Sequence, residues 1–180
     1  MRTTYKLVFS ALLIDVGLVL PFLTGQIPQV GNLLLPMHLP VFLCAFICGW
    51  QYGVAVGFIV PLLRSFLFGM PVLYPNAIAM AAELAVYGLV AGFLYKRMKK
   101  RSIGAVYGSL IPAMLLGRVA WGVVQVILLG ISGSAFTWQM FMAGAFLNAV
   151  PGIILQLVLI PAIMSMLHLA NKTKQKDTMK

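Results

Sequence analysis

The chain has few charged residues, and almost none of them are acidic. Of its 180 residues 9% are charged, with 13 Lys and Arg against 3 Asp and Glu, while 62% are hydrophobic. Soluble domains carry about a quarter charged residues, so this composition excludes one and indicates an integral membrane protein. Most of the +10 net charge lies in short clusters beside apolar runs, which is typical of a cytoplasmic membrane face and excludes a nucleic-acid-binding protein.

Cysteine and histidine are equally scarce, with two of each. Cys44 and Cys48 lie in an apolar segment without acidic or imidazole neighbours. A metal site needs more ligands and a disulfide across one helical turn is strained, so we expect two small, buried, apolar residues and no metal or cofactor. The chain also lacks a G-x-x-x-x-G-K-[ST] phosphate loop, so any ATP hydrolysis coupled to it requires another chain.

Six apolar runs approach or exceed the roughly 20 residues that a membrane-spanning helix requires. We expect the first run to be a retained helix, because no small-x-small cleavage site follows it. The last run is longer than a span requires, and Pro151 and Pro161 are expected to bend it or trim its ends. The sequence therefore predicts one all-α membrane domain of six transmembrane helices, at about residues 7–23, 33–49, 52–69, 77–95, 103–129 and 138–169.

Basic residues set the predicted orientation. An even number of spans places the three basic clusters on one side, which the excess of Lys and Arg identifies as the cytoplasm. Both termini are then cytoplasmic, and residues 170–180 form a basic cytoplasmic tail. The clusters are Arg2 with Lys6, Lys96–Arg101 and Lys172–Lys180, whereas the loops at Gln26, Met70–Asn76 and Gly130–Thr137 contain no Lys or Arg.

Polar side chains inside the predicted spans usually line a cavity or pathway. A rise of about 1.5 Å per residue places several of them in the outer half of the membrane or near its midplane, as one outward-opening pocket would require. Two arginines against one glutamate in this layer indicate a ligand with an anionic group. Arg118 and Glu83 can equally form a packing pair between helices. The candidate binding residues are Gln26, His38, Arg64, Asn76, Glu83, Arg118, Trp121, Gln125 and Asn148.

Small residues recur at intervals of four, which lets membrane helices approach closely. We expect most of these ridges to serve packing within the chain, and one or two faces to meet a partner subunit. The ridges are Gly49-Gly53-Gly57, Ala77-Ala81-Ala85, Gly88-Gly92, Gly104-Gly108 and Ala145-Ala149.

The segment Met37–Gly57 (MHLPVFLCAFICGWQYGVAVG), followed by Pro61, the MPVLYPN loop, Glu83-Leu84 and Tyr87-Gly88, resembles the substrate-binding S components of energy-coupling factor (ECF) vitamin transporters. The resemblance extends over most of the chain. It implies a non-enzymatic, high-affinity binding subunit in a prokaryotic plasma membrane, whose pocket opens outward.

The resemblance also implies partners. These are a transmembrane coupling subunit, two ABC-type ATPases and a vitamin-like substrate, for which the excess arginine favours an anion such as pantothenate; pyridoxine-like, folate-like and flavin compounds stay open. The family often docks its coupling subunit on two alanines four apart in the first helix. Here that spacing gives Ala11 and Asp15, so the aspartate departs from the pattern and points to a basic or polar group on the partner.

Two other functions fit parts of the sequence. A solitary secondary transporter would use Glu83 or Asp15 as a proton carrier, but inverted halves are then expected and the acidic residues occupy unrelated positions. An intramembrane serine protease would use Ser132 in its G-x-S-G motif, but the predicted topology places His168 at the opposite membrane face from Ser132.

Overall fold

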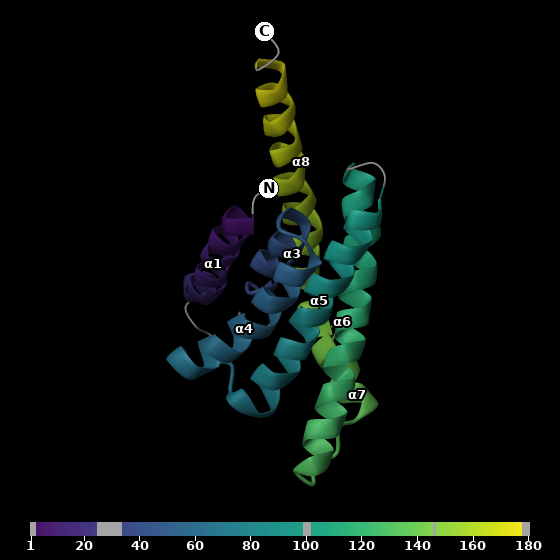
Figure 1. Cartoon of the computed structure of the whole chain (residues 1–180). Coiled ribbons are helices and arrows are strands. Elements are labelled where there is room, and N and C mark those ends of the chain that lie inside the picture. The colour runs from purple at the N-terminus through teal and green to yellow at the C-terminus, as the bar shows by residue number, and fades with distance from the viewer. Residues whose placement is uncertain (1–2, 25–33, 99–101, 146, 178–180) are drawn as a thin grey trace.

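The computed structural model describes residues 3–24, 34–98, 102–145 and 147–177, which form helices and turns without a strand. Helix α1 begins near the same end of the bundle at which the last helix, α8, ends (Figure 1). The elements are α1 (Thr3–Val19), η1 (Leu20–Thr24), α3 (His38–Ile47), α4 (Trp50–Phe68), η2 (Leu73–Ala77), α5 (Ile78–Arg97), α6 (Ile103–Ile131), α7 (Trp138–Ala145), η3 (Leu147–Ala149) and α8 (Val150–Asp177).

Five helical segments of the described chain are long and apolar enough to cross a membrane. They coincide with the first, third, fourth, fifth and sixth predicted runs, so the prediction of an all-α membrane protein is confirmed. That the termini face the cytoplasm stays a prediction. The segments are Thr3–Phe22, Trp50–Phe68, Leu73–Arg97, Ile103–Ile131 and Trp138–Ala170.

The second predicted span, 33–49, is a much shorter helix. Helix α3 has 10 residues, which at about 1.5 Å per residue covers about half of a hydrocarbon core of roughly 30 Å. Before it the chain turns at Leu35, whose φ of 50° is left-handed, and at Pro36. The helix packs against α1, α4 and α5, so other helices rather than lipid cover most of its surface. The described helix is therefore shorter than the predicted run, and a membrane crossing at 33–49 stays a prediction.

The sixth run is divided. Helix α7 ends at Ala145, and after the short η3 turn α8 begins at Val150. Pro151 stands in the first turn of α8, where its missing N–H costs no helical hydrogen bond, so it marks the start of a helix as expected. Pro161 lies inside α8, which continues to Asp177 and extends beyond the other helices (Figure 1). The predicted tail thus begins as a continuation of the helix.

Helices α4 and α5 pack closely because glycines face each other between them. A Cβ at Gly57 would overlap the Leu84 carbonyl, and one at Gly88 would overlap the backbone of Gly53. The prediction of close packing is confirmed for these two ridges. Such contacts are needed in lipid, where no hydrophobic drive brings helices together.

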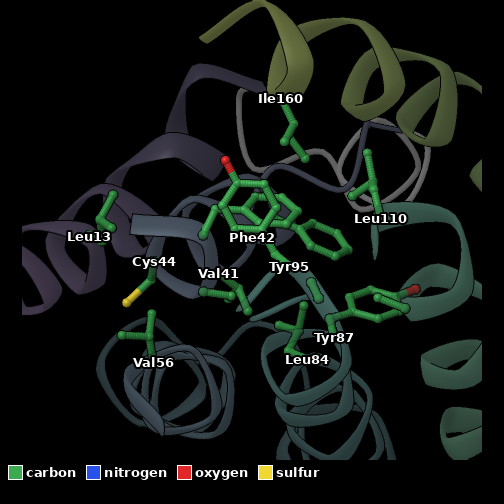
Figure 2. Close-up of a cluster of buried hydrophobic side chains, with 14 of the residues drawn as sticks. Leu13, Val41, Phe42, Cys44, Val56, Leu84, Tyr87, Tyr95, Leu110 and Ile160 are labelled. Carbon is green, nitrogen blue, oxygen red and sulfur yellow. The ribbon is translucent and has the colours of Figure 1, made fainter. Parts of the chain in front are cut away.

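The core lies around α3 (Figure 2). The Phe42 and Tyr87 rings stack with centroids 5.0 Å apart, so this contact joins α3 to α5. Cys44 and Cys48 are buried free thiols, as the sequence predicts.

Candidate functional site

Three helices bring four polar side chains together, which we call the buried polar cluster: His38 of α3, Glu83 and Tyr87 of α5, and Arg118 of α6. Arg118 Nη1 lies 2.9 Å from Glu83 Oε1, and the Tyr87 hydroxyl donates to the same oxygen at 2.6 Å. His38 Nε2 lies 3.5 Å from it. The packing pair of Arg118 and Glu83 that the sequence allowed is therefore formed.

Local sequence explains how the cluster is built. Glu83 and Tyr87 are one helical turn apart, so they share a face of α5. On α6, Gly117 leaves room for the Tyr87 ring, which a Cβ there would overlap. The ring of His38 lies 5.4 Å from that of Tyr87. Glu83, Tyr87 and His38 are each 1% exposed and Arg118 is 5% exposed, so the cluster is shielded from solvent.

Several polar atoms of the cluster have no hydrogen-bond partner. They are Nε and Nη2 of Arg118 and both ring nitrogens of His38, because the His38 Nε2 contact with Glu83 falls short of a hydrogen bond. A buried donor without a partner loses its hydrogen bonds to water, and no hydrogen bond within the protein offsets that loss. Such atoms are uncommon in folded proteins, where an ordered water, an ion or a ligand group usually satisfies them.

A second polar pair joins α6 to η2, the short helical segment that leads into α5. Gln125 Nε2 donates to Asn76 Oδ1 at 3.4 Å. Asn76 precedes Glu83 by seven residues and Gln125 follows Arg118 by seven, as antiparallel helices require. The two pairs are thus about 10 Å apart along the seam between α5 and α6.

The structure does not bring Arg64 to this seam. Its Nη1 donates to the Leu18 carbonyl at 2.5 Å, and its guanidinium lies 5.0 Å from the Phe22 ring and 5.4 Å from the Phe68 ring. Cation–π contacts of this kind stabilise a buried cation. The predicted excess of positive charge in one layer is therefore replaced by a balanced pair of Arg118 and Glu83.

A hollow of about 410 Å³ lies between α6 and α7. Its lining is apolar apart from Thr137 and the indole of Trp138. Gly122 of this lining lies one helical turn beyond Arg118 on α6 and faces Phe141 of α7. Trp121 packs beside it, with its ring 5.7 Å from Phe136. The lining residues are Val119, Gly122, Val123, Val126, Phe136, Thr137, Trp138 and Phe141.

The remaining predicted residues lie apart from the cluster. Asn148 is exposed in η3, and Gln26 lies outside the described residues. Ala11 and Asp15 are exposed on α1, on a face that also carries Val8, which is 65% exposed, and Leu12, which is 52% exposed. Asp15 is therefore a carboxylate on an apolar outer face.

Sequence reasoning passed over Tyr87 and Gln156, both of which are buried. The four-residue interval from Glu83 could have identified Tyr87, because it places both side chains on one face. Gln156 of α8 is 1% exposed and both its side-chain polar atoms lack a partner. As a polar residue inside an apolar run it carried the same signal as Gln125.

The protease motif does not form a catalytic site in the described part of the chain. The Ser132 hydroxyl is exposed and donates to the Leu129 carbonyl at 2.9 Å. His168 Nδ1 instead lies 3.1 Å from the Met164 carbonyl, within its own helix.

A family model, "ECF transporter, substrate-specific component", matches residues 5–164. The chain belongs to this family. Comparisons with curated proteins and with solved structures gave no match. The resemblance noted from the sequence is thus confirmed, and this S component is a substrate-binding, non-catalytic membrane subunit of an ECF importer. Membership also implies association with a transmembrane coupling subunit and ATPases in separate chains, which favours the importer over the secondary transporter and the protease.

Proposed function

We propose that this S component binds a small, anionic, vitamin-like nutrient and that Arg118 receives the anion. The observation that carries the proposal is the unpartnered Nε and Nη2 of Arg118 in a cluster shielded from solvent. These two nitrogens form one edge of the guanidinium, whose parallel N–H donors match the two oxygens of a carboxylate.

The cluster supports this role because Glu83 occupies only Nη1 of Arg118. Tyr87 holds the carboxylate of Glu83, which in turn holds the arginine in place before a ligand arrives. A donor fixed in this way loses little side-chain entropy on binding, which favours high affinity.

The rest of the ligand would extend past Gly122 toward the hollow between α6 and α7, beside which Trp121 packs, with Gln125 two turns beyond Arg118 on α6. Apolar walls with a few polar groups are typical of small-molecule sites. Pantothenate remains the first candidate because it joins a carboxylate to a compact body. Arg64 is no longer part of the proposed site.

Binding of matched acids and neutral analogues tests the proposal. Purified protein in detergent is titrated with pantothenate against panthenol and nicotinate against nicotinamide, and thermal stabilisation reports binding. We expect at least one acid to bind at least tenfold more tightly than its neutral analogue. Equal affinity within both pairs, or no binding of either acid, would exclude an anion site.

A matched pair of substitutions then locates the site. Arg118→Lys keeps the positive charge but removes the two parallel N–H donors of the guanidinium. The affinity for the acid should therefore fall at least tenfold, or about 1.4 kcal/mol. Arg64→Lys makes the same change in the other buried arginine and should leave affinity unchanged. If the two variants lose affinity equally, the effect comes from the bundle and not from Arg118.

The outer face of α1 is proposed as the docking surface for the coupling subunit. Asp15 is exposed among apolar side chains, where a carboxylate is costly unless a basic or polar group of a partner meets it. Ala11→Trp should leave ligand binding intact and impair ATP-driven uptake in a reconstituted transporter. Normal uptake by this variant would exclude the face. The cytoplasmic termini and the prokaryotic plasma membrane belong to the same proposal.

A further inference from the structure

An anion bound at Arg118 would leave the buried polar cluster with an unbalanced negative charge; this step rests on the proposed function. Without ligand, the Arg118 guanidinium and the Glu83 carboxylate balance each other at 2.9 Å. A ligand carboxylate adds one negative charge among residues that are at most 5% exposed. An unbalanced charge shielded from water is strongly unfavourable, so a further positive charge is needed.

His38 is placed to supply that charge. Its Nε2 lies 3.5 Å from Glu83 Oε1, and neither ring nitrogen has a hydrogen-bond partner. Imidazole is the side chain that gains or loses a proton between about pH 5 and pH 8. We infer that His38 takes up one proton from solvent when the anionic substrate binds, and so becomes the second cation of the site.

The groups around His38 leave it as the proton acceptor. Glu83 already accepts from Arg118 and Tyr87, and both contacts favour its ionised form. The Tyr87 hydroxyl donates its proton to Glu83. A protonated His38 then gives Glu83 a second cationic neighbour while Arg118 is shared with the ligand.

Within the described residues, the other elements packed against α3 bring no competing ionisable group to the His38 ring. Asp15 of α1 is exposed, and Arg64 of α4 is held by Phe22 and Phe68. His168 of α8 is placed at the Met164 carbonyl. The charge change is therefore assigned to His38 within the described chain.

Isothermal titration calorimetry measures the proton directly. Pantothenate and nicotinate are titrated into the detergent-purified protein in phosphate and in Tris at one pH, and the difference in enthalpy gives the protons taken up. We expect about one proton for each acid that binds and none for panthenol or nicotinamide. The affinity for the acid should fall about tenfold per pH unit on the alkaline side, the slope of one linked proton.

His38→Gln and His168→Gln form a matched pair. We expect H38Q to bind the acid more weakly and with an affinity that does not depend on pH. H168Q should still take up one proton when the acid binds. If the unsubstituted protein binds the acid without taking up a proton, or if H38Q takes up a full proton on binding, this inference is overturned. The proposed anion site at Arg118 is unaffected by either result. If neither acid binds, the proposed function fails and this inference with it.

Discussion

The two arginines in the spans show how differently one membrane bundle stabilises the same side chain. Arg64 is 3% exposed and Arg118 is 5% exposed. At the corner of α1 and α4, Arg64 is held by a carbonyl and two aromatic rings, with no acidic partner among the described residues. In the seam of α5 and α6, Arg118 pairs with a carboxylate but keeps two unpartnered nitrogens.

This difference teaches that a buried charge alone does not identify a binding site. The corner uses two polarisable rings and one carbonyl, and none of the buried polar atoms without a partner in the described chain belongs to Arg64. In the seam between α5 and α6, Glu83 pairs only with Nη1 of Arg118. The Nε and Nη2 donors of Arg118 are therefore left without a partner. The available donors, and not the charge, distinguish the candidate site.

The largest expected change in stability comes from removing the Glu83 carboxylate that pairs with Arg118. Glu83→Ala leaves Arg118 charged and buried without its partner, which should lower the free energy of unfolding by about 3–5 kcal/mol. Thermal unfolding in detergent measures the loss. Asp15→Asn removes a carboxylate from the exposed face of α1 and should change stability little in the isolated subunit. Equal stability of the two variants would contradict the charge balance in the seam.

A smaller effect is expected from the close contact that seats Tyr87. Gly117→Ala places a methyl group on the Tyr87 ring, which must move away from α6. Overpacking of this kind costs about 1–3 kcal/mol. Gly130→Ala is the control on the same helix, since nothing lies within 4 Å of the added Cβ. The prediction is contradicted if both variants unfold at the same temperature.

The smallest effect is expected at the corner. Phe68→Leu keeps an apolar side chain but removes one of the two rings beside Arg64. The loss should be about 0.5–2 kcal/mol of stability, with no change in ligand affinity. Unfolding and acid binding of the same variant are measured together. A tenfold loss of affinity would mean that the corner belongs to the binding site after all.

Much of the fold could be predicted from the sequence because lipid imposes simple requirements on it. Apolar length identified five of the spans, and glycine spacing predicted the close approach of α4 and α5. The short α3 was missed because a helix covered by other helices needs no full span, which run length does not reveal. The interruption between α7 and α8 was placed only approximately, by Pro151.

For the candidate site, depth counting grouped residues that lie on different faces. It placed Glu83 and Arg118 in the outer half of the membrane and His38 at or near the outer helix ends, and the side chains of these three residues do meet. It could not separate Arg64, because a similar depth says nothing about which helices are neighbours. Tyr87 was passed over because a tyrosine in a span is unremarkable until its hydroxyl is seen on Glu83.

The sequence by itself determined that this chain lies in a membrane as a helical bundle, since 62% hydrophobic residues and 9% charged ones leave no other stable arrangement. Only the tertiary structure decided which polar groups are neighbours. Rotation about each helix axis and the pairing of helices set those contacts, and both follow from side-chain packing between distant segments. The pairing of Glu83 with Arg118, and the separation of Arg64 from both, follow from that packing.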